Sequence, residues 1–353
     1  MDLLEQKLQD ICLKFTKKHQ PLQIMITSNI LSQPFVFSTT DRNQVFHSAS
    51  VGKLTTMIVI MNALEKYRLT LDTPFMQFAD KTLLDGLFIY RGVDYSTEVT
   101  LRHLLSHTSG INDYFEGKSK KAKPLLKQMI ANPDQFFTPQ DLLDFTRNFQ
   151  EPVAVPGKKF YYSDSGYILL GLIAERLYEK PFHQILRDVV FDPLGMKHTG
   201  LCCYDPMFDK ISLAPVMING IDFSKSKALS IDFSGGGLFT TTEDLTTLLQ
   251  AIHQRRILSE EAYQMIFPAD HYFRSGMFYG LGIMEMQFDK LFFLLKGFPR
   301  LVGHTGILGV HAWLDPQNGN TYVINISNMN HIASSYQLLI TCLSVINQKG
   351  HIN

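Results

Sequence analysis

Several features that define large protein classes are missing from this sequence. Its four cysteines, Cys12, Cys202, Cys203 and Cys342, match no zinc-ligand spacing and no disulfide framework, which favours a reducing compartment. No apolar run approaches the roughly 20 residues that span a bilayer. The 33 lysines and arginines equal the 33 aspartates and glutamates, so net charge gives no case for a nucleic-acid or anionic-membrane partner. We therefore expect a globular chain with no nucleic-acid partner and no membrane span.

Catalytic motifs of several other enzyme classes are also missing. No G-x-S-x-G occurs, which argues against the α/β-hydrolase fold. The glycine-rich stretch "SGGGLFTT" at 234–241 lacks both a P-loop lysine and the third glycine of a dinucleotide loop, so it predicts a tight connection. His103 and His107 have metal-ligand spacing, but the glutamate of H-E-x-x-H is absent. The sequence predicts no metal site and no cofactor.

The first residues do not have the pattern of an export signal. The stretch "MDLLEQKLQDICLKF" has neither a basic start nor a continuous apolar segment. Leu4, Leu8, Ile11 and Phe15 recur at helical spacing instead. We expect an amphipathic helix and a cytoplasmic location, or an extracytoplasmic one if an export segment precedes the chain.

Strand-like and helical patterns divide the chain into regions. Stretches 22–28 and 34–40 have strand character, the pattern from about 65 to 200 is mainly helical, and strand-like stretches return near the C-terminus, among them "KLFFLLKG" at 290–297. This order predicts an α+β fold with an antiparallel sheet built from both chain ends and flanked by helices. We expect a sheet domain from 1–64 and 201–353, a mainly helical domain from 65–200, and the active site between them.

The stretch "SASVGKLTTM" at 48–57 carries a candidate nucleophile. Ser50 begins an apolar, buried helix, where unpaired N–H groups and a partial positive charge favour an oxyanion. Lys53 lies one turn further on the same face, and a buried lysine needs partners. Ser224 and Lys227 have the same spacing, but no such helix follows them. The surroundings therefore favour Ser50 and Lys53.

Together with four further stretches, this motif resembles the serine β-lactamase-like family. The stretches are "HLLSHTSG" at 103–110, "PGKKFYYSDSGYILLGLIAERL" at 156–177, "DPLGM" at 192–196 and "VGHTGILG" at 302–309. The family includes class C β-lactamases, low-molecular-weight penicillin-binding proteins, and related esterases and D-amino-acyl amidases. The resemblance runs from about residue 40 to the C-terminus and implies a β-lactamase/transpeptidase-like fold.

The resemblance also implies a set of site residues. The family motif S-x-x-K falls on Ser50 to Lys53, Y-x-N on Tyr162 to Asp164, and H-T-G on His304 to Gly306. The implied catalytic residues are Ser50, Lys53, Tyr162 and His304, and the implied substrate-binding residues are Asp164, Thr305, Gly306 and Ile307. Ile307 would supply the second oxyanion N–H beside that of Ser50. Asp164 departs from the family asparagine, and an ionised carboxylate accepts hydrogen bonds but cannot donate them.

These residues predict acyl transfer through a serine. Serine is a weak nucleophile until a base removes its proton. Either the Lys53 cation favours a Tyr162 phenolate, or desolvation leaves Lys53 neutral, and the sequence leaves both open. We expect His304 to shuttle a proton or to bind the substrate.

The sequence therefore predicts a serine hydrolase that forms an acyl-enzyme on Ser50. Its expected substrates are small molecules, either carboxylic esters or small (D-amino-acyl) amides. The alternatives are a β-lactamase or D,D-carboxypeptidase, and a non-catalytic binding protein on the same fold.

Overall fold

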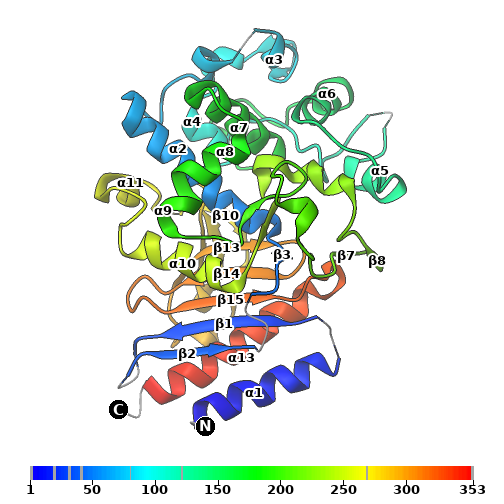
Figure 1. The fold of residues 1–353 in the computed structure, drawn as a ribbon. Coiled ribbons are helices and arrows are strands. Elements are labelled where there is room, and N and C mark those ends of the chain that lie inside the picture. Colours follow the sequence, from blue (N-terminus) through cyan, green and yellow to red (C-terminus); the bar gives the residue numbers. More distant parts are fainter. Residues whose placement is uncertain are drawn as a thin grey trace.

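An eight-stranded antiparallel sheet organises the fold in a computed structural model that describes residues 3–18, 21–30, 33–39, 43–79, 81–120, 122–267 and 269–350. The strand order is β10-β11-β12-β13-β14-β15-β1-β2 (Figure 1). The strands are β1 Gln23–Ser28, β2 Phe35–Ser38, β10 His271–Arg274, β11 Met277–Tyr279, β12 Met284–Met286, β13 Leu301–Gly306, β14 Val310–Leu314 and β15 Thr321–Asn325. The predicted antiparallel sheet from both chain ends is confirmed.

The two ends of the chain meet where β1 pairs with β15. Ile24 lies opposite Ile324 and Ile26 opposite Tyr322. These four side chains face a core beneath α1 Leu3–Thr16 and α13 Ile332–Gly350, which lie side by side on that face of the sheet (Figure 1). Side chains point alternately to the two faces of a strand, so Val323 faces the larger core on the other side.

Helices cover the opposite face of the sheet and form the upper half of the molecule in Figure 1. α10 Thr242–His253 packs directly on β14 and β15. α2 Lys53–Tyr67 and α7 Asp164–Tyr178 pack against each other and are buried on most sides, as their apolar sequences predict. The others are α3 Lys81–Leu84, α4 Leu101–Leu105, α5 Leu125–Ala131, α6 Pro139–Phe149, α8 Phe182–Leu186, α9 Asp192–Leu194 and α11 Glu260–Met265. α12 Phe288–Leu291 instead packs its buried Phe288 into the core on the α1 and α13 side. None of the helices in the described ranges is both long and apolar enough to cross a bilayer.

Short strands and turns connect these layers. A three-stranded sheet joins β3 Phe46–His47, β9 Leu238–Thr240 and β6 Gly200–Leu201, and two hairpins pair β4 Ile89–Tyr90 with β5 Val93–Asp94 and β7 Met217–Ile218 with β8 Ile221–Asp222. Because β3 ends two residues before Ala49, this small sheet fixes the start of the turn that carries Ser50.

One predicted strand is wrong. The stretch "KLFFLLKG" forms the end of α12 and the 3₁₀ turn Phe293–Leu295 instead of a strand. A continuous apolar run predicts a buried strand only if both faces are covered. Here Phe293 is 71% exposed and Leu294 is 69% exposed, so no layer covers them.

Candidate active site

A 3₁₀ turn, Ala49–Gly52, holds Ser50 immediately before α2. The Lys53 N–H donates to the carbonyls of Ser50 and Val51, which joins the turn to the helix. Gly52 packs so closely on Gly236 that a Cβ atom at position 52 would lie 2.8 Å from the Gly236 Cα. This contact requires glycine and fixes the turn that carries Ser50 against the segment that follows the 3₁₀ helix Lys227–Gly235.

Lys53 is fully buried and is held by three polar partners. Its Nζ lies 3.2 Å from the Ser50 Oγ, donates to the Gly235 carbonyl and forms an ion pair with Asp164. It also lies 5.1 Å from the centre of the Tyr162 ring. A buried cation is tolerated only when it is paired and hydrogen bonded, so these contacts explain why a lysine occupies the core.

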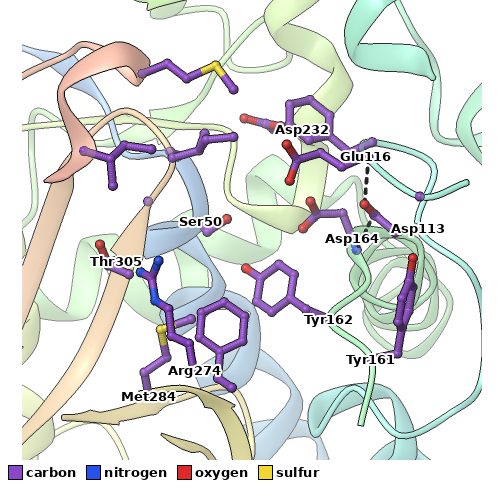
Figure 2. Close-up of a pocket in the computed structure, with 18 of the residues that line it drawn as sticks. Ser50, Asp113, Glu116, Tyr161, Tyr162, Asp164, Asp232, Arg274, Met284 and Thr305 are labelled. Carbon is purple, nitrogen blue, oxygen red and sulfur yellow. Dashed lines mark hydrogen bonds between the residues drawn. The ribbon is translucent and has the colours of Figure 1, made fainter. Parts of the chain in front are cut away.

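Tyr162 completes the arrangement around the serine. Figure 2 shows its hydroxyl directed toward Ser50. The His107 ring packs on the Tyr162 ring with their centres 4.2 Å apart and holds its orientation. Burial and the nearby Asp164 carboxylate raise the pKa of the Tyr162 phenol well above its ordinary value near 10, and the nearby Ser50 hydroxyl partly offsets this. The resting side chain is therefore a phenol, which does not fit the phenolate alternative.

His304 is fully buried beside the cavity, and both of its ring nitrogens are engaged. Nδ1 lies 2.8 Å from the Thr305 carbonyl, which only accepts, so Nδ1 carries the proton. Nε2 then accepts from the Tyr279 hydroxyl at 3.2 Å. Burial and the Lys53 charge lower the pKa of His304 to about 3. A proton shuttle at this position does not fit the geometry, because neither nitrogen is available to a substrate.

Six of the eight predicted site residues line one cavity of about 630 Å³, and only Lys53 and His304 do not. Ser50, Tyr162, Asp164, Thr305, Gly306 and Ile307 all contribute to it. The Thr305 hydroxyl donates to the Val310 carbonyl, which fixes its direction. A Cβ atom at Gly306 would lie 3.3 Å from the Ser50 backbone nitrogen, so the end of β13 meets the turn that carries Ser50. The volume suits a small-molecule ligand.

Charge is distributed unevenly around this cavity. Asp113, Asp164, Asp232 and Glu116 lie on one side, and Arg274 lies on the other (Figure 2). Burial and the Asp164 carboxylate raise the pKa of Asp113 to about 7. The same two causes raise the pKa of Asp232 to about 7, and Lys53 opposes them. The charge of Asp113 and Asp232 therefore changes with pH near neutrality.

Sequence reasoning missed several residues that shape this site. Asp113 accepts hydrogen bonds from the backbone N–H groups of Asp164 and Glu116, and so orders the start of α7. Asp232 lies 3.5 Å from the His47 ring. Neither aspartate stands in a motif, so no local signal marked them. The sequence predicts only a tight connection at the glycines 235–237, whereas in the structure the Gly235 carbonyl accepts a hydrogen bond from Lys53.

Comparison with known proteins identifies the family. The family model described as Beta-lactamase matches residues 37–338, which is most of the chain. The chain therefore belongs to the beta-lactamase family, as its motifs predict.

Individual relatives are distant. Penicillin-binding protein 4* of Bacillus subtilis is 26% identical over 285 residues, which cover 75% of this chain and 56% of that protein. The chain spans about half the length of the first curated relatives it matches, from 46% to 56%.

Solved structures confirm the predicted β-lactamase/transpeptidase-like fold. The D-amino acid amidase from Ochrobactrum anthropi is 19% identical with a TM-score of 0.80, covering 98% of this chain and 99% of that chain. EstCE1, a hydrolase with promiscuous acyltransferase activity, is 18% identical with a TM-score of 0.72, covering 97% and 98% of the two chains. At these identities the likeness establishes the fold, and the activity has to be argued from the site.

Proposed function

We propose that this protein is a serine hydrolase that acts on small esters or amides through an acyl-enzyme on Ser50. One observation carries the proposal: the Ser50 hydroxyl lies in the cavity with the Lys53 ammonium 3.2 Å away and the Tyr162 hydroxyl directed toward it. A nucleophile within reach of an acid–base group and a cation is the arrangement that acyl transfer needs.

In the proposed acylation step Tyr162 exchanges one proton for another. The Ser50 Oγ attacks the acyl carbon, its proton passes to the Tyr162 oxygen, and the phenol proton passes to the leaving group as the acyl bond breaks. Lys53 stays an ammonium and stabilises the negative charge on the serine oxygen, while Asp164 balances its charge. The Ser50 and Ile307 N–H groups hold the oxyanion, each worth about 2.7–4 kcal/mol. In deacylation a water molecule attacks the acyl carbon, its proton passes to the Tyr162 oxygen, and the phenol proton returns to the Ser50 Oγ as the ester bond breaks and the acid is released.

The acidic side of the cavity supports substrates that carry an amine. Asp232 and Glu116 line the cavity near Asp164, and a substrate ammonium group there would offset their charge. A D-amino-acyl amide or ester carries such a group, and a structural neighbour bears the name D-amino acid amidase. We therefore place amino-acyl esters and amides before uncharged ones.

A β-lactamase or D,D-carboxypeptidase is the second candidate, and Arg274 is the observation that favours it. A guanidinium pairs well with a carboxylate, which both of those substrate classes carry. Against it, Asp164 replaces the amide that the family uses to bind a substrate carbonyl, and its carboxylate is engaged with Lys53. The cytoplasmic location and the domain boundaries expected from the sequence stay predictions.

Labelling with a fluorophosphonate probe tests the proposal. We expect wild type to be labelled and Ser50→Ala not to be labelled, with equal thermal stability of the two proteins as the control for folding. Absence of labelling in both would support the non-catalytic alternative. Comparing turnover of nitrocefin with that of p-nitrophenyl aminoacyl and acyl esters then ranks the two enzyme candidates.

A further inference from the structure

The segment from Lys290 to Gly297 exposes a continuous apolar tip. Its four consecutive residues Leu291, Phe292, Phe293 and Leu294 are 39%, 49%, 71% and 69% exposed. Single exposed apolar residues are ordinary, whereas a contiguous run of exposed apolar residues is typical of an interaction surface. The tip therefore needs a partner.

The segment is held firmly, so the exposure is not the result of a loose chain. Phe288 is buried and its ring packs on Phe298 with their centres 5.3 Å apart. The Phe292 N–H donates to the Phe288 carbonyl at 3.0 Å, and the Phe298 N–H donates to the Leu295 carbonyl at 3.0 Å. Inner residues anchor two successive turns to the core beneath the sheet, and the residues between them point outward.

Positive charge flanks the tip on both sides. Lys290 and Lys296 are exposed, and neither forms an ion pair within the part of the chain that the structure describes. Asp289 is the one acidic residue of 288–297, so this segment carries a net charge of +1 from two lysines and one aspartate. The chain as a whole has no net charge, but at physiological ionic strength only charges within about 8 Å of a surface act on it.

The size of the tip decides between a second copy and a lipid surface. Even at roughly 200 Å² for each fully exposed side chain, the exposed parts of the four residues 291–294 together offer at most about 460 Å². A stable protein interface needs about 800 Å² on each partner. A small apolar tip between two lysines fits a bilayer interface better, with the rings at the acyl boundary and the ammonium groups among anionic headgroups.

We propose that this tip binds the surface of anionic membranes. This proposal does not depend on the proposed function, but the tip and the active-site cavity lie close together. A Cβ atom at Gly276 would lie 2.7 Å from the Leu291 Cβ, so α12 packs on the β10–β11 turn. β10 ends two residues earlier, at Arg274, which lines the cavity together with Phe273. Docking the tip brings one wall of the active site close to the lipid surface.

Flotation with lipid vesicles tests this. The full chain is mixed with vesicles of phosphatidylcholine alone or of equal parts phosphatidylcholine and phosphatidylglycerol. We expect wild type to float with the anionic vesicles, and to do so less at high salt. The double variant Phe293→Ser, Leu294→Ser should lower the bound fraction about tenfold or more, because the lost apolar burial exceeds what one decade of affinity requires. The charge variant Lys290→Glu, Lys296→Glu should bind weakly and without salt dependence.

Ile221→Ser serves as the matched control, because Ile221 is 47% exposed in another hairpin and its change should leave binding intact. Fluorophosphonate labelling and the melting temperature should stay at wild-type values in every variant, which separates this test from that of the proposed function. The proposal would be overturned if wild type failed to float, or if the Phe293→Ser, Leu294→Ser variant bound as well as wild type. Wild-type self-association in sedimentation that the serine variant abolishes would also overturn it and assign the tip to a second copy.

Discussion

Replacing Asp164 by asparagine tests how the charge of Lys53 is set. Asp164 forms the ion pair with the fully buried Lys53, so Asp164→Asn leaves a buried cation without its counter-ion. Removing one partner of a buried pair costs about 3–5 kcal/mol. We take about 3 kcal/mol, because the Asp164 side chain is 12% exposed and Asp232 still acts on Lys53. The free energy of unfolding of the variant should therefore be about 3 kcal/mol lower near neutral pH.

The assay is kcat/KM for a chromogenic ester, measured from acidic to alkaline pH. If the ammonium form is the active one, as we propose, the alkaline limb of the profile moves to lower pH. If neutral Lys53 is the base, the acid limb moves instead and the variant gains activity at low pH. If the variant is folded and neither limb of its kcat/KM profile moves, the ion pair with Asp164 does not set the charge of Lys53.

The control for this experiment is Asp232→Asn, which removes a carboxylate from the same cavity that makes no direct contact with Lys53. Its displacement of either limb should be much smaller. Asp164→Asn also restores the family residue, and we expect it to improve β-lactam acylation relative to ester hydrolysis. An unchanged ratio would remove Asp164 from the choice of substrate.

Three further changes test other parts of the site. The raised pKa of Asp232 means that the folded state binds this proton more tightly than the unfolded state, so stability is full below pH 4 and falls as pH rises to about 7. Asp232→Asn should therefore raise the melting temperature by a few degrees above pH 7 and leave it unchanged near pH 4, whereas a gain independent of pH would contradict this cause. Tyr162→Phe should lower kcat by about 10²–10⁴-fold at nearly unchanged stability, and near-wild-type turnover would exclude the proton exchange. Gly52→Ala should destabilise by about 1–3 kcal/mol in denaturant unfolding because its Cβ meets the Gly236 backbone, whereas Gly297→Ala, with no atom within 4 Å of the added Cβ, should have no effect.

Local sequence signals predicted the nucleophile and its immediate partners. Ser50 and Lys53 stand one helical turn apart, so their contact follows from helix geometry alone. The strands around His304 and the closing helix were marked by their periodicity. Tyr162 was placed through the family resemblance, since nothing in its own stretch distinguishes it from a core tyrosine.

The sequence could not show which distant groups meet. The resemblance assigned Asp164 to substrate binding, whereas the structure places its carboxylate on Lys53, a pairing that depends on how α7 packs against α2. The sequence predicts that His304 shuttles a proton or binds the substrate, and only the fold shows that Tyr279 and the Thr305 carbonyl contact its two ring nitrogens. "KLFFLLKG" failed as a strand because coverage by a second layer, which no local pattern records, decides between strand and surface turn.

The pairing of β1 with β15 has a consequence for how the protein is made. The Gln23 and Asn325 side chains hydrogen bond at 2.7 Å across a separation of 302 residues. A ribosome adding about 5–20 residues per second needs about 15–60 s to travel that distance. Throughout that interval the nascent β1 lacks its central neighbour, and the Ser50 helix emerges long before β13 exists to close the cavity. The cavity is therefore completed late in synthesis, when the last strands emerge.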